Sequence, residues 1–331
     1  MELLSVTMND GVMPRSEIEG KDNSSEDKSN YKVVLTGDMV YNSMRMWQGA
    51  NGISPCDGIV SPAYTVLMPK IPISNGYFAA FFKSPNLINE FRKNSQGMTS
   101  DTWNLKYPQI ETIKVCIPAL SEQNRVADML RTLERRIAKQ AQLVDNLKKY
   151  KRGLNKLVFE KITSGAKQQI PLSELCESIS SGRTTSSNAD GIFPLFGSTG
   201  VVGKTNIIEF DGDIVLIARV GANAGKVNYF SGQCAVTDNT LVIRVKENLV
   251  QAKFLAFFLE YYNLHRLIFG SGQPLVTGGQ LKKIKMPLVS LTTQVSLTRR
   301  LEALDSIIEV HEKYAQSLTL LKSGLMQQLF I

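Results

Sequence analysis

The sequence predicts an α+β protein made of two domains in tandem repeat, separated by two long antiparallel helices that form a coiled coil. Three observations predict this architecture. The second half of the chain repeats the first, each copy contains a heptad pattern of apolar residues, and short strand-like segments precede each heptad region. The chain has 331 residues, of which 43% are hydrophobic and 21% charged, so each half can bury a core of its own.

The internal duplication is clearest toward the carboxyl end of each half. Residues 113–159 align with residues 284–330 at a constant offset of 171, without a gap. Twelve of the 47 aligned positions are identical, and they include a glutamine, a lysine and a glycine as well as leucines. A repeat of this length indicates two copies of one large unit rather than a short-period solenoid.

Each copy ends in a predicted helix of about 38 residues, which corresponds to a length on the order of 55 Å. Ser121 and Thr292 are the expected N-caps of these helices. Apolar residues recur at alternating spacings of three and four, which is typical of a coiled-coil seam. The predicted seam residues are Val126, Leu130, Leu133, Ile137, Leu147 and Leu154 in the first helix and Leu297, Leu301, Leu304, Ile308, Leu318 and Leu325 in the second.

Two polar residues interrupt the seams at matched positions. Gln140 and His311 lie near the middle of their helices, where antiparallel pairing would bring them within hydrogen-bonding reach. A single polar seam residue commonly fixes the register of a coiled coil. That role is favoured for His311 over a metal-binding or catalytic one.

The expected domain boundaries follow these helices. A polar linker with one glycine follows the first helix. We expect a first domain at residues 1–118, a first long helix at 119–162, a linker at 163–169, a second domain at 170–289 and a second long helix at 290–331.

Inside each domain, strands are expected before a helix. Strands are predicted at residues 213–220 and 240–245, between Gly-Asp and Asn-Gly turns, and helices at 76–94 and 252–269. The duplication is fainter here. Gly-Asp-Met-Val at residues 37–40 aligns with Gly-Asp-Ile-Val at residues 212–215.

The net charge of +8 is unevenly distributed along the chain. Residues 121–162 carry +6 and residues 163–289 carry +3, whereas residues 1–120 carry −1. A basic excess fits a polyanionic partner such as DNA. A solvated helix surface explains the charge of the first long helix equally well.

Cysteine and histidine usage indicates no metal site. The four cysteines lie about sixty residues apart, and His265 and His311 do not cluster with them. No Ser-His-Asp, Cys-His or His-Glu-x-x-His arrangement is found, so no catalytic residue is assigned and no cofactor is expected on this chain. The sequence has no signal peptide and no apolar run of roughly 20 residues, so we expect a cytoplasmic protein without a membrane segment.

The stretch Leu-Phe-Gly-Ser-Thr-Gly-Val-Val-Gly-Lys-Thr-Asn at residues 195–206 resembles a phosphate-binding loop at first sight. That motif has four residues between its two glycines and a helix after its lysine. Here five residues separate Gly197 from Gly203, and a strand is expected from Asn206 onward. The spacing favours a turn, and a nucleotide-dependent enzyme that uses residues 197–205 is retained as an alternative function.

Several short motifs, in this order around the two helices, resemble those of the specificity subunit of type I restriction-modification enzymes. In the first half they are Leu4-Ser-Val-Thr7, Gly58-Ile-Val-Ser-Pro-Ala-Tyr64 and Ile117-Pro-Ala-Leu-Ser-Glu-Gln123. In the second half they are Phe196-Gly-Ser-Thr-Gly200, Asp238-Asn-Thr240 and Gly270-Ser-Gly-Gln-Pro274. The resemblance covers essentially the whole chain.

The resemblance implies two target recognition domains, each of which reads one half of a split, asymmetric sequence in double-stranded DNA. It implies that the helix pair sets the spacing between these halves and binds two methyltransferase subunits, and that restriction (motor-nuclease) subunits join for cleavage. The specificity subunit itself is then non-catalytic. S-adenosylmethionine, ATP and Mg are expected on the partner subunits.

Base reading requires Arg, Lys, Asn or Gln side chains on loops that enter a groove of the duplex. Each candidate could equally be an exposed polar loop residue or a turn former. The DNA-binding candidates are Asn42, Arg45, Arg183, Ser198, Lys204, Arg219, Asn223, Lys226 and Gln273.

One segment departs from the family's pattern. Residues 170–182 open the second domain, and the family places such a segment at the start of the first domain too, where this sequence begins directly with Met-Glu-Leu-Leu-Ser. We therefore expect a first domain that is shortened at its amino end. A coiled-coil adaptor with no sequence readout of its own is the corresponding alternative function.

Overall fold

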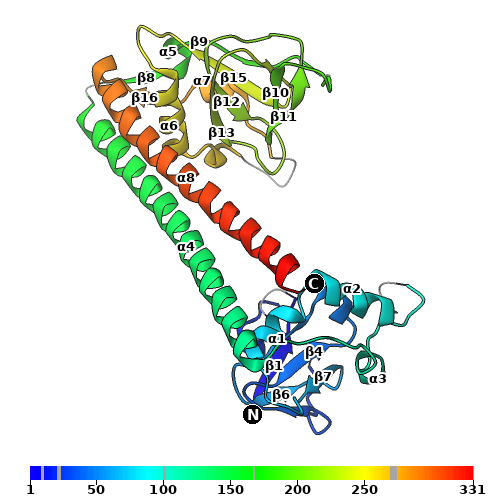
Figure 1. The fold of residues 1–331 in the computed structure, drawn as a ribbon. Helices are drawn as coiled ribbons and strands as arrows, with labels where there is room; N and C mark the ends of the chain where they lie inside the picture. Colours follow the sequence, from blue (N-terminus) through cyan, green and yellow to red (C-terminus); the bar gives the residue numbers. More distant parts are fainter. Residues whose placement is uncertain are drawn as a thin grey trace. The chain divides into compact units, whose positions relative to one another are not determined.

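Figure 1 shows the computed structural model of the chain, which describes residues 1–8, 11–20, 24–99, 102–166, 168–185, 187–268 and 274–330. The chain divides into two compact units. Unit 1 comprises Met1–Gln142 and Glu312–Ile331, and unit 2 comprises Leu143–His311. Each unit contains strands, short helices and part of both long helices, which confirms the predicted α+β class.

Two small sheets form the first domain, with strand orders β2-β1-β6-β3 and β5-β4-β7. Leu4, Val40 and Val60 are buried together in one core cluster of this domain. The strands are β1 (Glu2–Val6), β2 (Val12–Pro14), β3 (Lys32–Val34), β4 (Met39–Asn42), β5 (Asn51–Ile53), β6 (Gly58–Val60) and β7 (Tyr64–Leu67).

The helix expected at residues 76–94 is two helices, α1 (Asn75–Phe81) and α2 (Pro85–Asn94). The break occurs at Ser84, whose hydroxyl accepts a hydrogen bond from the Leu87 amide at 3.4 Å, and Pro85 occupies the first helical position. A further short helix, α3 (Tyr107–Ile110), precedes the first long helix.

The second domain has a four-stranded sheet of order β13-β12-β15-β9, a three-stranded sheet β11-β10-β14 and the pair β16-β8. Its strands are β8 (Gln169–Pro171), β9 (Cys176–Ser181), β10 (Phe193–Gly197), β11 (Gly200–Thr205), β12 (Asp213–Ala218), β13 (Val227–Ser231), β14 (Ala235–Val236), β15 (Thr240–Val245) and β16 (Lys285–Pro287). Its short helices are α5 (Leu172–Leu175), α6 (Ala252–Tyr262), the 3-10 helix η4 (Leu264–Leu267) and α7 (Gly278–Lys282).

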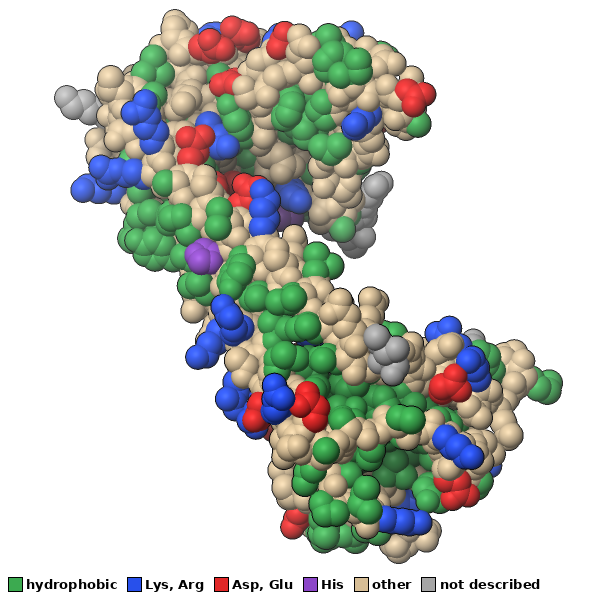
Figure 2. Space-filling model, viewed as in Figure 1, with side chains coloured by type: hydrophobic (Ala, Val, Ile, Leu, Met, Phe, Trp, Pro, Cys, Tyr) green, Lys and Arg blue, Asp and Glu red, His purple; other side chains and the backbone are tan. Residues whose placement is uncertain are grey.

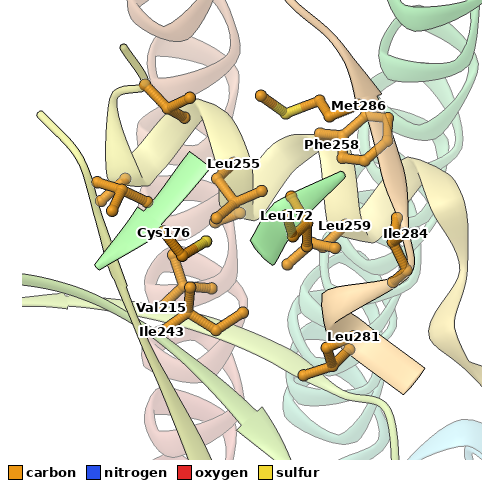
Figure 3. Packing of buried hydrophobic residues seen from close by; sticks show 14 of the residues in the cluster. Leu172, Cys176, Val215, Ile243, Leu255, Phe258, Leu259, Leu281, Ile284 and Met286 are labelled. Atoms are coloured by element: carbon orange, nitrogen blue, oxygen red, sulfur yellow. The ribbon is translucent and has the colours of Figure 1, made fainter. Parts of the chain in front are cut away.

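These bounds test the expected elements of the second domain. The strand predicted at 240–245 is confirmed as β15, and the one predicted at 213–220 ends earlier, at Ala218. The helix predicted at 252–269 ends at Tyr262, because Asn263 adopts a left-handed conformation with φ of 57° and accepts the His265 amide. Helix α6 packs on the large sheet, and its apolar face forms the core shown in Figure 3.

The two domains repeat one sheet register. Met39 of β4 pairs with Leu67 of β7, and Val215 of β12 pairs with Ile243 of β15. All pairs of β4 with β5 and β7 reproduce those of β12 with β13 and β15 when 176 is added to each residue number. The sequence alignment of residues 37–40 with 212–215 is therefore wrong by one residue.

The two long helices are α4 (Leu120–Gly165) and α8 (Leu291–Leu329), with 46 and 39 residues. Helix α4 continues through the first part of the predicted linker, to Gly165. Helix α8 begins at Leu291, and Ser290 Oγ accepts the Thr293 amide at 3.3 Å. Ser290 rather than Thr292 is therefore its capping residue.

Within each unit the two helices run antiparallel. In unit 1, Glu134 pairs with Lys322 at 2.7 Å, and the Arg136 guanidinium donates to the Tyr314 hydroxyl at 3.0 Å. In unit 2, Lys151 pairs with Asp305 at 2.6 Å. This last pair is the Glu134–Lys322 pair with 171 added to or subtracted from each number, so both halves of the helix pair use one repeated ion pair.

The predicted seam residues lie away from solvent. Val126, Leu130, Leu133, Leu301, Ile308 and Leu318 are buried, and Ile137, Leu147, Leu154, Leu297, Leu304 and Leu325 are half-buried. Gln140 belongs to unit 1 and His311 to unit 2, so their mutual hydrogen bond stays a prediction.

Matched glutamines attach each long helix to the domain before it. Gln123 Oε1 accepts the amide of Ser74, the N-cap of α1, and Gln294 Oε1 accepts the amide of Gln251, the N-cap of α6, both at 2.9 Å. Their amide nitrogens donate to the carbonyl five residues back, at Pro118 and at Val289. The identity of this residue in both copies thus reflects one joint used twice.

Matched phenylalanines close the other end of each helix. Phe159 of α4 is buried against Phe254 and Phe258 of α6, with ring centroids 5.2 and 5.6 Å apart. Phe330, after the end of α8, is buried against Tyr77 and Phe81 of α1 at 5.3 and 5.5 Å. Each long helix therefore begins at one domain and ends in the core of the other.

Candidate nucleic-acid interface

Four of the nine DNA-binding candidates lie at one edge of the large sheet in unit 2, the edge formed by the ends of its strands. Because neighbouring strands are antiparallel, β9 and β12 end at this edge and β13 and β15 begin there. Arg183 follows β9, and Arg219, Asn223 and Lys226 lie in the loop between β12 and β13.

Backbone hydrogen bonds hold the 219–226 loop in place. The Arg219 amide donates to Asn239 O at 2.9 Å, and Arg219 O accepts the Val276 amide at 2.9 Å. The Gly221 amide donates to Pro274 O at 3.1 Å. Two segments that are distant in sequence, at Asn239 and at residues 274–276, therefore meet the loop and fix the position of its backbone.

Glycine is required at one position of this loop. Gly225 has φ of 85°, and a Cβ there would lie 3.2 Å from the backbone of Leu264 and His265. The tight turn leaves Lys226 exposed and Asn223 half-buried. Arg219 is half-buried, and its guanidinium donates to Asp238 O at 3.5 Å.

Glu209 positions the neighbouring segments at the same edge. Its carboxylate accepts from the Arg183 amide at 2.8 Å, the Thr184 hydroxyl at 3.1 Å and the Val236 amide at 3.2 Å. The Arg183 side chain remains exposed. Sequence reasoning missed Glu209, because an isolated acid in a basic domain carries no local pattern.

The 195–206 stretch is a β-hairpin. Strands β10 and β11 pair from Phe193 with Thr205 to Gly197 with Gly200, which leaves Ser198 and Thr199 as the turn. The strand expected after Asn206 is wrong, because it lies within the stretch and ends at Thr205. A hairpin offers no helix N-terminus for a phosphate, so the structure disfavours the nucleotide-binding alternative.

The two DNA-binding candidates of the hairpin, Ser198 and Lys204, lie at its opposite ends. The Thr237 amide donates to Phe196 O at 2.8 Å, which places the Ser198 turn beside the edge that carries Arg219. Lys204 pairs with Pro194 at the other end of the hairpin and is exposed there. Gln273 lies outside the described residues.

The corresponding loop of unit 1 contains the other two candidates. Residues 43–50 follow β4 as 219–226 follow β12, and Gly49 has φ of 87°, close to that of Gly225. The Leu105 amide donates to Ser43 O at 2.8 Å, as the Val276 amide does to Arg219 O. Adding 176 relates the loop residues, so both domains present the same loop at the same sheet edge.

The side chains of this loop differ from those in unit 2. Arg45 is exposed, and its guanidinium donates to Gln48 Oε1 at 3.4 Å. Asn42 Oδ1 accepts the Met44 amide at 3.0 Å, so Asn42 stabilises the turn.

An aromatic pair beside Arg45 was missed from the sequence. The rings of Trp47 and Trp103 meet edge to face with centroids 5.1 Å apart, and Trp47 Nε1 donates to Met44 O. They are the two tryptophans of the chain, far apart in sequence. The rarity of tryptophan was the one signal in the sequence that could have pointed to these residues. That the two rings lie together could be seen only in the folded structure.

Charged side chains of both signs are scattered over the face shown in Figure 2. Within the described ranges, no group of three or more His, Cys, Asp or Glu side chains is arranged to hold a metal ion. No helix in those ranges is both long and apolar enough to cross a membrane.

Comparisons with known proteins point to one family. Residues 166–320 match the family described as Type I restriction modification DNA specificity domain. The chain is 25% identical over 355 aligned residues to the MjaVIII specificity subunit of Methanocaldococcus jannaschii, covering 91% of this chain and 81% of that one. The chain is thus similar, over most of its length, to type I restriction-modification specificity subunits.

Other specificity subunits align with this chain less completely or at lower identity. The match to the EcoprrI specificity subunit of Escherichia coli, 28% identical over 116 residues, covers 35% of this chain and only 29% of that subunit. The crystal structure of an S subunit from M. genitalium has the same fold, with a TM-score of 0.66 at 16% identity over 99% of this chain and 94% of that one.

Proposed function

We propose that this chain is the DNA-specificity subunit of a type I restriction-modification complex and reads a bipartite, asymmetric sequence in double-stranded DNA. Each domain reads one half of the target with the sheet edge that carries residues 43–50 or 219–226. The chain contributes recognition and assembly, and the chemistry belongs to other subunits.

The repeated loop is the observation that carries this proposal. Both loops are tight turns held by backbone hydrogen bonds, and both expose a cationic side chain, Arg45 in one and Lys226 in the other. Arg and Lys donate to phosphate oxygens and to the acceptors of guanine in the major groove. A rigid loop at an equivalent position in two domains suits two half-sites.

The partner subunits proposed here are those that the resemblance to specificity subunits implies. Two methyltransferase subunits would bind the helix pair, and restriction subunits would join that complex. S-adenosylmethionine, ATP and Mg would be bound by those subunits. One solved relative comes from a study of complex assembly in a type I restriction-modification system, with a TM-score of 0.61 at 19% identity.

Gel shifts of the chain with its methyltransferase on a random duplex pool test the proposal. We expect enrichment of two short constant sequences separated by a spacer of fixed length. Complex formation without any enriched sequence would favour the adaptor alternative. Retention on immobilised ATP that is lost in Lys204→Ala would favour the nucleotide-dependent alternative.

A further inference from the structure

The two domains differ in the elements next to the repeated sheet, which is β13-β12-β15 in unit 2 and β5-β4-β7 in unit 1. In unit 2 the segment Gln169–Ser181 forms β8, α5 and β9, and β9 pairs with β15. Among the residues of unit 1 that the structure describes, none forms a counterpart of these three elements. The strand pairing that both domains repeat identifies the features of unit 1 that these elements would contact.

The first exposed feature is a strand edge. In unit 2, β15 lies between β12 and β9, and Ile243 pairs with Ile179. In unit 1, β7 corresponds to β15 but is the last strand of its sheet. No strand among the described residues pairs with the outer edge of β7, although Tyr64 O of β7 accepts a hydrogen bond from Lys32 Nζ at 2.5 Å. This edge is thus a template for strand addition.

The second exposed feature is an extended segment before α4. In unit 2, Met286 of β16 pairs with Ile170 and is 0% exposed. Its counterpart at an offset of 171 is Val115, which lies outside any strand and is 43% exposed.

The third feature is an apolar groove between these two edges, with a volume of about 230 Å³. We call it the docking groove, and its lining includes Met39, Leu67, Lys70, Phe78, Phe82 and Ile117. Met39, Leu67 and Phe82 correspond to Val215, Ile243 and Phe258 of unit 2. Figure 3 shows those three residues in the cluster that also contains Leu172 and Cys176.

Lys70 lies at the rim of the docking groove, where its ammonium group can donate hydrogen bonds. In unit 2 the Lys246 amide donates to Leu175 O at 2.9 Å, and Lys246 Nζ donates to Glu174 O at 2.8 Å. Adding 176 relates Lys70 to Lys246, and Lys70 is exposed. The donor that fixes α5 in unit 2 is therefore repeated in unit 1.

We propose that the docking groove binds a polypeptide segment that has the chemistry of Gln169–Ser181. This segment has a strand, one apolar helical turn with leucines three residues apart, and a second strand. Its strands would pair with residues 114–116 and with β7, its leucines would enter the groove, and Lys70 would donate to its carbonyls. It would complete the first domain as Gln169–Ser181 completes the second.

A synthetic peptide of residues 168–182 tests this proposal against the full chain in reducing buffer. We expect saturable binding in fluorescence anisotropy, and amide exchange protection of β7 and of residues 114–116. A peptide with Leu172→Asp and Leu175→Asp should bind at least about tenfold more weakly, because two carboxylates would replace apolar side chains in a groove lined mainly by apolar residues.

Chain variants locate the bound peptide. Val115→Asp and Lys70→Glu should each weaken binding, whereas Val33→Asp, at an exposed apolar position outside the groove, should not. All three positions are exposed, so the variants should fold. No binding, or exchange protection confined to unit 2, would overturn the proposal. Self-association of the chain that Val115→Asp abolishes would instead assign the groove to a second copy.

Discussion

Lys151, a residue of the repeat, makes contacts that the heptad pattern of the long helices does not predict. Its ammonium lies 2.6 Å from Asp305 and 3.5 Å from Glu260, over the ring of Phe257 at 5.1 Å. Burial raises the pKa of the Glu260 carboxyl, and Lys151 opposes that rise. The heptad pattern predicted a polar exception in the seam, but not the two carboxylates around it.

Lys151→Met should lower the free energy of unfolding by about 1–2 kcal/mol, because it leaves the carboxylates of Glu260 and Asp305 without their cation, at a site where solvent screens them in part. The pKa of Glu260 rises further in this variant. Its stability loss is then small below the unfolded-state pKa of Glu260 and grows as the pH rises through the folded-state pKa. Urea unfolding at pH 4.5 and 7.5 measures this difference.

Lys322→Met is the matched control, since Lys322 meets only the exposed Glu134 among the ion pairs of the described residues. Its cost should stay within about 1 kcal/mol. Equal losses in the two variants, at both pH values, would contradict the role assigned to Lys151.

At the scale of elements, sequence reasoning succeeded where a long period repeats. The seam of α4 and α8 was visible because apolar residues recur over five heptads, and Gln123 with Gln294 supported the register. It failed at short elements. The break at Ser84, the cap at Ser290 and the hairpin at Gly197–Gly200 depend on two or three local bonds that a periodic pattern does not encode.

The candidate site was predictable in composition but not in arrangement. Loop residues such as Arg219 and Lys226 follow from the chemistry of base and phosphate recognition. The contributions of Glu209, and of Trp47 with Trp103, arise from contacts between segments that only the folded chain brings together. The separation of Lys204 from Ser198 likewise depends on the hairpin register.

Leu133→Asp tests the helix pair. Leu133 is buried in unit 1, so a carboxylate there has no partner and should destabilise the protein by about 3 kcal/mol or more. Thermal unfolding should shift downward, and assembly with the methyltransferase should weaken. Arg135→Asp, at an exposed position two residues away, is the control. Unchanged melting and assembly of Leu133→Asp would refute the pairing.

Two substitutions in the 219–226 loop should separate base recognition from phosphate binding. Asn223→Ala should relax sequence preference in one half-site at a cost of about 1–3 kcal/mol if the amide contacts a base. If Lys226 contacts a phosphate, Lys226→Ala should weaken binding to all sequences and reduce the salt dependence by about one ion. Binding titrations at several salt concentrations, on cognate and altered duplexes, measure both effects. Identical affinities in the two variants and the unaltered chain would remove the loop from the interface.

At the scale of the whole molecule, the chain contains two copies of one arrangement, a domain followed by a long helix. Each long helix leaves its own domain at a glutamine joint and ends with a phenylalanine in the other domain's core. The repeated ion pairs and the repeated sheet register extend this equivalence through both units. Two equivalent readers in one chain suit a DNA target with two parts.

The most direct test of this account maps methylated adenines in DNA exposed to the complex of this chain with its methyltransferase. We expect methylation only within a bipartite sequence, with two constant parts separated by a spacer of fixed length. Exchanging residues 219–226 for another loop should change one part and leave the other intact. Methylation at a single uninterrupted sequence, or at adenines without a shared sequence, would contradict this account.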